Sequence, residues 1–293
     1  MTLLQSTRPS FLVLSPVCVF LGASTAMAAH GSVDAGVLAL IFIGAICAHI
    51  SVNTLNEYAD FRSGLDLVTV KTPFSGGSGA LPRDPAMAGK VLSMGLLSLG
   101  LTFAIGIYFV NSNGALIVPF GIAGIIIILT YTKWINRWPF ICLLAPGMGF
   151  GIIMVVGTHA VLTQHSTITA WLAALVPFFL VNNLLLLNQF PDIDADRSIG
   201  RNHLPIAFGT RTSSHVYAAL SAGTYLAILA GVYYGYFPVL SLVALLPALL
   251  SLFALTGAYR YGRNIGAHHQ YLAANVAATL LTPLLLGIAI IYG

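Results

Sequence analysis

The sequence predicts an all-α membrane protein, a bundle of nine transmembrane helices around a central cavity. Apolar residues make up 58% of the 293 residues and charged residues only 7%, whereas soluble domains carry about 25% charged residues. The mean hydropathy is +0.91. No polar stretch is long enough for a separate soluble domain, so residues 1–293 are expected to form a single integral domain.

Nine apolar runs approach the roughly 20 residues that a membrane-spanning helix needs. They are 11–29, 34–58, 87–110, 115–132, 139–162, 168–190, 214–236, 238–258 and 268–292. The first run could also be read as a cleavable signal peptide, with Arg8 before it and Ala26-Met27-Ala28 at its end. We favour a helix because of its length, and Pro16 is tolerable inside a membrane helix.

The basic residues test this helix count. All twelve precede the first run or fall in or beside every second connection: Arg8, Arg62, Lys71, Arg83, Lys90, Lys133, Arg137, Arg197, Arg201, Arg211, Arg260 and Arg263. One miscounted helix would scramble this pattern. The positive-inside rule then predicts a cytoplasmic N-terminus and cytoplasmic even-numbered loops in the cell (inner) membrane. The net charge of +4 therefore reports topology, and we expect no nucleic-acid partner.

Acidic residues gather at the cytoplasmic ends of the second and sixth predicted helices. Seven of the eight carboxylates lie in or just after these two stretches: Glu57, Asp60, Asp66, Asp84, Asp192, Asp194 and Asp196. Charge near hydrocarbon is costly and marks functional sites. The two helices run in the same direction, four helices apart, which suggests two pseudo-repeated halves around a shared cavity. The long loops 59–86 and 191–213 are expected to cover it.

Helical spacing aligns the polar residues of each cluster on one face. His49, Asn53, Asn56, Glu57 and Asp60 form one stripe, and Asn188, Asp192 and Asp196 form another. Two facing sets of oxygen ligands suit Mg²⁺, which is commonly held by a few carboxylates plus substrate phosphates. Zn²⁺ fits less well, because no Cys/His group has ligand spacing.

Basic residues beside the acidic clusters point to a diphosphate, which guanidinium groups can grip. Those nearest are Arg62, Lys71, Arg197 and Arg201, with Lys133 and Arg137 on the same side. A cavity with an ionic mouth inside an apolar bundle suits a diphosphate head on a hydrocarbon tail. The glycine-rich run 75–79 could cradle phosphate or act as a flexible hinge, and the sequence favours neither.

Both motifs resemble those of the UbiA superfamily of intramembrane aromatic prenyltransferases, and the resemblance covers nearly the whole chain. Asn56-Glu57-Tyr58-Ala59-Asp60, followed by Gly64 and Asp66, is similar to the first motif. Asn188-x-x-x-Asp192-x-x-x-Asp196 and the loop from Arg197 to Arg211 are similar to the second. The Gly64-Leu65-Asp66 spacing and the opening Arg8-Pro9, with Pro16 and Gly22, resemble the 1,4-dihydroxy-2-naphthoate (menaquinone) branch.

The resemblance implies Mg²⁺-dependent transfer of a polyprenyl group from a prenyl diphosphate to an aromatic acceptor, with no obligate protein partner. It implies that Asp60, Asp192 and Asp196 are catalytic. The implied metal ligands are Asn56, Glu57, Asp60, Asp66, Asp192 and Asp196. The implied substrate-binding residues are Asn53, Arg62, Lys71, Lys133, Asn188, Arg197 and Arg201.

This chain departs from the family pattern at three places. Glu57 stands where the family usually has Asp, Pro191 precedes Asp192, and Tyr131-Thr132-Lys133 fits only part of the pattern after the fourth helix. Hydroxybenzoate, homogentisate or a chlorophyll-like alcohol acceptor stays open. The alternatives from other classes are an ion-coupled secondary transporter and a non-catalytic scaffold. His49 could equally be a buried structural histidine or contact the acceptor.

Overall fold

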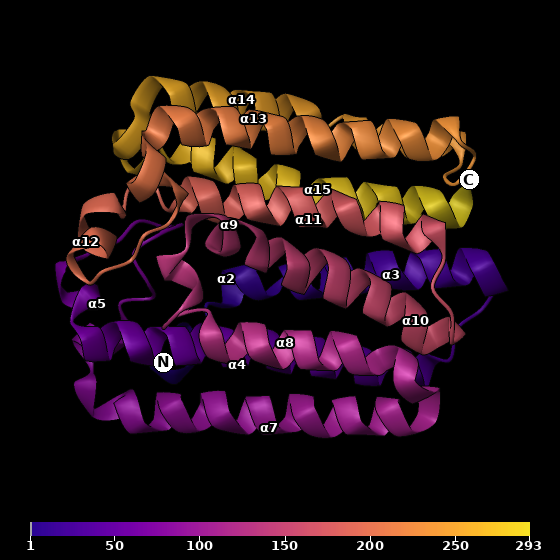
Figure 1. Ribbon diagram of the computed structural model, residues 1–293, viewed down its shortest axis with the longest axis horizontal. Helices are drawn as coiled ribbons and strands as arrows, with labels where there is room; N and C mark the ends of the chain where they lie inside the picture. The colour runs from indigo at the N-terminus through magenta and orange to yellow at the C-terminus, as the bar shows by residue number, and fades with distance from the viewer. Residues whose placement is uncertain (1) are drawn as a thin grey trace.

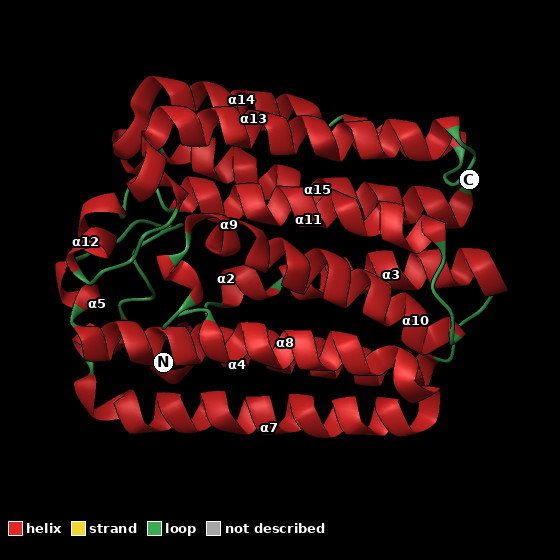
Figure 2. Cartoon of the chain, viewed as in Figure 1, coloured by secondary structure: helices red, strands yellow, loops and turns green. Residues whose placement is uncertain are grey.

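A computed structural model describes residues 2–293, and this part of the chain forms helices without any strand (Figures 1 and 2). The long helices lie side by side in one bundle (Figure 1). The long elements are α3 (Leu14–His30), α4 (Ala35–Ser63), α7 (Ala88–Asn113), α8 (Val118–Thr130), α9 (Pro139–Gly147), η4 (Met148–Val156), α10 (Gly157–Thr163), α11 (Ile168–Asn188), α13 (Leu204–Tyr233), η5 (Val239–Leu245), α14 (Ala248–Tyr261) and α15 (His269–Tyr292).

Within residues 2–293, eight helical stretches are long and apolar enough to cross a bilayer. One of them, Pro85–Thr130, is 46 residues long and contains both α7 and α8. Counted separately, these two helices complete the nine predicted segments. The chain is therefore an integral, multi-pass membrane protein, and the predicted fold class is confirmed.

Short helices make up most of the remaining chain. They are α1 (Thr2–Ser6), α2 (Pro9–Leu12), α5 (Leu65–Val68), α6 (Ala80–Arg83), η1 (Pro85–Met87), η2 (Gly114–Ile117), η3 (Ile135–Arg137), α12 (Ile193–Ser198) and η6 (Gly262–Ala267). Figure 1 shows α5 and α12 together at the left end of the bundle, where α4 and α11 also end. The two loops predicted to cover the site therefore lie at the same end of the molecule.

The fifth span is continuous but changes its winding. Pro146 lies near the end of α9, and η4 follows as nine residues of π-helix. Proline removes one helical hydrogen bond, and π-helical turns occur where the i→i−4 ladder is interrupted, often at functional sites. Asn182 of α11 accepts a hydrogen bond from the Gly147 N–H at 2.6 Å, so the neighbouring helix supplies a partner there.

Close packing of η4 on α11 depends on small residues. A Cβ at Gly147 would lie 2.2 Å from the Phe178 carbonyl oxygen, and one at Gly151 would lie 2.5 Å from the Phe178 nitrogen. Small residues four apart let membrane helices approach closely. This packing holds the distorted helix against the central one, with Val155, Leu180 and other buried apolar residues around it.

Two helices differ in extent from the prediction. Helix α13 begins at Leu204, ten residues before the predicted start at residue 214, and is broken at Gly209, where φ is 80° and ψ is 168°. Glycine adopts this conformation at little cost, so residues 204–208 form a separate first turn. Helix α4 continues to Ser63, five residues beyond the predicted end.

Candidate active site

A cavity of about 670 Å³ opens between the ends of α4 and α11. Along α4 it is lined by residues on one face, from Asp60 at the mouth to Ile41 near the other end. At 1.5 Å per residue this face is about 28 Å long. The mouth is polar, and the rest of the lining is mainly apolar side chains of α4, α7, α8 and η4. The predicted combination of an ionic mouth and an apolar interior is present.

The first motif presents oxygen atoms at this mouth. Asn53, Asn56 and Asp60 all line the cavity. The Asn53 side-chain amide donates to the Thr7 carbonyl oxygen at 2.9 Å, and that of Asn56 donates to the Thr132 hydroxyl at 3.2 Å. Each NH₂ group is thus engaged by a neighbouring segment, which orients the amide oxygens; that of Asn56 accepts a hydrogen bond from Arg8 at 3.1 Å.

The second motif follows the end of α11. The helix ends at Asn188, and Pro191 then separates it from α12. Asn188, Asp192 and Asp196 line the same cavity as the first motif. Asp194 points away: its side chain is 78% exposed and pairs with Arg263 at 2.9 Å. Asp192 and Asp196 are four residues apart and so share a helix face, whereas Asp194 lies on the other side of α12.

Arg201 joins the two motifs. Its guanidinium donates to Asp196 at 2.8 Å and also pairs with Asp60. A single guanidinium spans only a few ångströms, so the two carboxylates face each other across the mouth. His203 contributes a second contact, with Nε2 lying 3.0 Å from Asp196 Oδ2. The expectation that the two acidic clusters converge is thus met in the structure.

The glycine-rich run forms a strap between the motifs. The Gly76 N–H donates to Asp192 Oδ2 at 3.1 Å, and the Ser78 N–H donates to Glu57 Oε2 at 3.0 Å. A Cβ at Gly77, where φ is +70°, would lie 2.8 Å from Asp66 Oδ1. Glycine therefore allows both the backbone conformation and the close approach. Hydrogen bonds to Asp192 and Glu57 therefore fix the strap to both motifs, which does not fit a flexible hinge.

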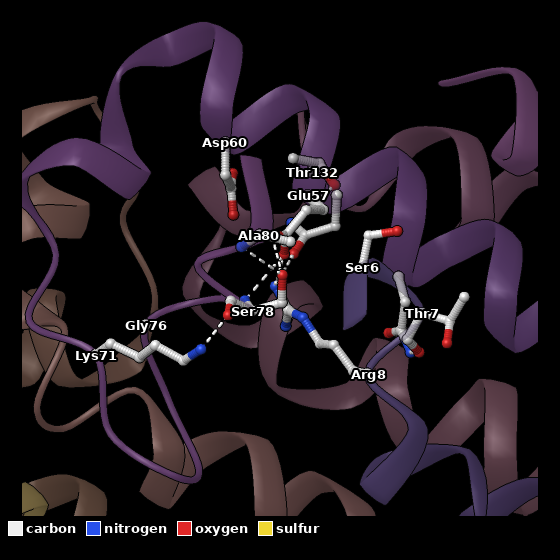
Figure 3. Close-up of polar contacts among 12 residues, drawn as sticks. Ser6, Thr7, Arg8, Glu57, Asp60, Lys71, Gly76, Ser78, Ala80 and Thr132 are labelled. Atoms are coloured by element: carbon white, nitrogen blue, oxygen red, sulfur yellow. Dashed lines mark hydrogen bonds and ion pairs between the residues drawn. The ribbon is translucent and has the colours of Figure 1, made fainter. Parts of the chain in front are cut away.

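Glu57 holds this strap. Figure 3 shows its carboxylate directed at Ser78, with the Arg8 side chain close by. The Ser78 hydroxyl donates to Glu57 Oε1, and Arg8 lies 3.4 Å from Glu57 Oε2. The Glu57 residue is fully buried and is not part of the cavity wall. The longer arm, compared with the aspartate usual at this position, therefore reaches the strap.

Burial sets the protonation of the carboxyls near the strap. Burial and, to a smaller extent, the charges of Glu57 and Asp60 together raise the pKa of Asp66 to about 7. Burial likewise raises the pKa of Asp192 to about 7, assisted by Asp196 and opposed by the Gly76 N–H. Carboxyls desolvated in this way gain from a nearby cation.

Unpaired buried oxygens indicate where such a cation fits. Asp66 Oδ2, Asn188 Oδ1 and Asp192 Oδ1 are buried without a hydrogen-bond partner. Buried polar atoms normally have partners, and oxygen-only donors suit a hard divalent cation. No three His, Cys, Asp or Glu side chains among residues 2–293 are close enough to hold a metal by themselves. The donor set therefore fits a cation whose remaining ligands are water or phosphate.

Four of the predicted substrate-binding cations lie outside the cavity. Arg62, Lys71, Lys133 and Arg197 are exposed and do not line it. Lys71 donates to the Ser78 carbonyl oxygen (Figure 3) and Arg197 lies 3.5 Å from the Ile206 carbonyl oxygen. Neither contact involves a carboxylate of the two motifs.

Arg8 is a cavity residue that was not among the predicted site residues, although Arg8-Pro9 contributed to the family resemblance. It lines the mouth, donates to Asn56 Oδ1 at 3.1 Å, and has a left-handed backbone with φ of 52°. Such a conformation is uncommon for a residue other than glycine and often marks a functional position. The feature of the sequence that could have pointed to Arg8 as a site residue is its position directly before Pro9.

The sequence of residues 15–276 matches the UbiA prenyltransferase family. The chain belongs to the UbiA prenyltransferase family. It is therefore a prenyltransferase, and the transporter and scaffold alternatives are set aside.

Two curated relatives carry the description 1,4-dihydroxy-2-naphthoate octaprenyltransferase. The protein from Bacillus subtilis is 29% identical over 225 residues, covering 76% of this chain and 70% of the relative. That from Haemophilus influenzae is 26% identical over 210 residues, covering 70% and 68%. The predicted resemblance to this branch of the UbiA family is confirmed.

Solved structures agree on the fold. A UbiA homologue from Archaeoglobus fulgidus, bound to DMAPP and Mg²⁺, superposes with a TM-score of 0.68 at 14% identity. The alignment covers 99% of both chains. Because the sequence identity is only 14%, this structural similarity supports the fold of the chain and not its substrate.

Proposed function

We propose that this UbiA-family chain transfers a polyprenyl group from a prenyl diphosphate to 1,4-dihydroxy-2-naphthoate, in a Mg²⁺-dependent step of menaquinone biosynthesis. The observation that carries the proposal is the meeting of two carboxylate motifs at the mouth of an apolar cavity. The names of the two curated relatives support the acceptor. The solved homologue with DMAPP and Mg²⁺ supports the donor and the metal.

The residues that would hold Mg²⁺ are Asp60, Asp66, Asp192 and Asp196. The side-chain amide oxygen of Asn188, Oδ1, lies at the same mouth. Their oxygens line one mouth, and three of them lack partners there. When bound, the metal would neutralise diphosphate oxygens and so stabilise the leaving group. Glu57, predicted from the resemblance to be a ligand, is better assigned to holding the strap.

Arg201 and Arg8 would bind the diphosphate. Arg201 forms ion pairs with Asp60 and Asp196. Burial alone would lower the pKa of Arg201, but these two carboxylates raise it above its ordinary value, so the group stays charged. A metal ion at the carboxylates would free this guanidinium to contact phosphate oxygens.

The remaining groups position the substrates and exclude water. The strap covers the mouth, and apolar side chains surround the region below it, where a prenyl chain would lie. In the transfer the allylic C–O bond breaks and a ring carbon forms the new C–C bond. In dihydroxynaphthoate the ring carboxylate leaves as carbon dioxide. Holding two substrates in a dry cavity is a major source of rate enhancement.

Two aspartate variants test the catalytic assignment. Asp60→Ala and Asp192→Ala should each lower Mg²⁺-dependent diphosphate release from a labelled prenyl diphosphate at least about a hundredfold, the size expected for losing a major electrostatic contact. Asp194→Ala is the matched control, since its side chain points to solvent, and should retain activity. Full activity in both test variants would refute the metal assignment.

Mass spectrometry tests the acceptor. Cells lacking this protein should lose prenylated naphthoquinones, and the purified enzyme should prefer dihydroxynaphthoate in a panel with hydroxybenzoate and homogentisate. Unchanged naphthoquinones, or a clear preference for another ring, would refute this acceptor while leaving the prenyl transfer intact.

A further inference from the structure

His49 lies in the cavity wall, below the carboxylate mouth, and is 5% exposed. Its Nδ1 lies 2.8 Å from the Ser15 hydroxyl of α3. Its ring meets the edge of Phe150 with centroids 4.7 Å apart and planes inclined by 70°. The imidazole is therefore fixed on two sides, by a hydroxyl and by an aromatic ring.

The position of His49 on α4 places it between the ionic mouth and the apolar interior. It shares a helix face with Asn53, Asn56 and Asp60 and is seven residues from Asn56, or about 10 Å along the axis. Phe150 belongs to the π-helix η4, a kind of distortion frequent at functional sites. The allylic carbon of the donor lies next to its diphosphate, just below the mouth. An aromatic acceptor that contacts this carbon would lie at the level of His49 in the cavity.

The second ring nitrogen of His49 has no protein partner. Ser15 holds Nδ1, and no hydrogen bond to Nε2 is found within residues 2–293. A polar atom left unpaired against an apolar wall is unfavourable. Nε2 is thus a polar contact that the cavity offers to a ligand.

His159 shows how a purely structural histidine is arranged in this fold. It is fully buried and outside the cavity wall. Its Nδ1 lies 2.9 Å from the Thr25 hydroxyl, also on α3, and its Nε2 lies 3.3 Å from the Thr167 hydroxyl. Both nitrogens are thus engaged, whereas His49 uses only one.

We propose that His49 Nε2 hydrogen-bonds a ring hydroxyl of the aromatic acceptor and thereby selects hydroxylated rings. The inference rests on the proposed function. The hydrocarbon tail of the donor offers no hydrogen-bonding atom, and its diphosphate belongs with the carboxylates and arginines at the mouth. A ring hydroxyl both donates and accepts, so it satisfies Nε2 in either tautomer that Ser15 imposes.

The test compares His49→Leu and His49→Gln with wild type in steady-state transfer. The acceptors are 1,4-dihydroxy-2-naphthoate and the two monohydroxy-2-naphthoates that each lack one of its hydroxyls. We expect His49→Leu to raise the acceptor KM about tenfold, the loss of one hydrogen bond in a buried site, with an unchanged donor KM. Wild type should have a lower KM for the dihydroxy ring than for one of the monohydroxy rings. This difference in acceptor KM should disappear in His49→Leu and partly return in His49→Gln.

His159→Gln is the matched control and should keep both the acceptor KM and the hydroxyl preference. Thermal unfolding checks that all variants are folded. A hydroxyl preference that persists in His49→Leu, or equal increases in the donor and acceptor KM, would overturn the inference. A wild-type enzyme that prenylates no hydroxylated ring would overturn the proposed function itself, which the wild-type assay reveals separately.

Discussion

Asp66 and Asp192 show how burial prepares a residue for a metal. Desolvation by burial and like charges nearby together raise the pKa of each carboxyl to about 7. Each also has one oxygen without a partner. At the scale of the residue, burial therefore places these carboxylates in an unfavourable environment that a divalent cation would relieve.

The raised pKa values predict that the metal-free protein loses stability as pH rises. Between about pH 4 and pH 7 the folded protein keeps protons on Asp66 and Asp192 that the unfolded chain has released. The free energy of unfolding therefore falls with increasing pH through this range. We expect the melting temperature in EDTA to decrease from pH 5 to pH 8.

Saturating Mg²⁺ should remove most of this pH dependence, because its binding displaces the same protons. The measurement is thermal unfolding in detergent with and without the metal. A melting temperature in EDTA that does not fall with pH would contradict the prediction.

The strap of residues 75–79 is the element that completes the mouth. Its amides bind Glu57 and Asp192, one carboxylate from each side of the site. Lys71 and Arg83 also donate to carbonyl oxygens of the strap, those of Ser78 and Gly79. These contacts hold the strap at the mouth from both sides.

Loosening the strap should lower activity without removing a metal ligand. Ser78→Ala deletes one of the two hydrogen bonds to Glu57, and we expect kcat to fall several-fold to about tenfold, with faster proteolysis within residues 69–79. Asp84→Asn, in the same loop but without contacts to either motif, is the control. Equal protease resistance in Ser78→Ala and wild type would show that Glu57 does not hold the strap.

Helix α8 forms a thin wall of the cavity. None of its residues is buried, and Gly121 and Gly124 line the cavity opposite Gly106 of α7. A Cβ at Gly106 or Gly121 would meet no atom within 4 Å. This space lies in the apolar part of the cavity, where we expect the prenyl tail of the donor.

Filling this space should discriminate between donors by length. Gly106→Leu is expected to reduce transfer from a long polyprenyl diphosphate about tenfold or more while sparing a two-isoprene donor, whose tail ends higher in the cavity. Gly100→Leu is the matched control, because Gly100 lies on α7 outside the cavity and is equally free of neighbours. Equal activities of Gly106→Leu with both donors would contradict this path for the tail.

At the scale of the whole molecule, charge and acid gather at one end. Helices α4 and α11 end there, and α5 and α12 lie beside them (Figure 1). The basic residues of the sequence predict that this end faces the cytoplasm. The mouth of the cavity would then receive water-soluble substrate and Mg²⁺ from the cytoplasm, while the apolar part lies within the membrane.

Cysteine labelling tests this orientation. In a background without Cys18, Cys47 and Cys142, Arg137→Cys should react with an impermeant thiol reagent only from the cytoplasmic side. His165→Cys, exposed in the opposite loop, should react only from outside. The reverse pattern would invert the proposed topology.

The sequence alone determined the helices, the single bundle and the position of both acidic motifs. These features depend on hydrophobic length, on the side of each basic residue and on spacing within one helix, all of which are local. It did not foresee that Glu57 binds the strap, that Arg8 enters the mouth, or that Lys71 and Lys133 stay outside. Each of these outcomes depends on which side chain of a distant segment comes within hydrogen-bonding range, and only the packing of the helices decided that.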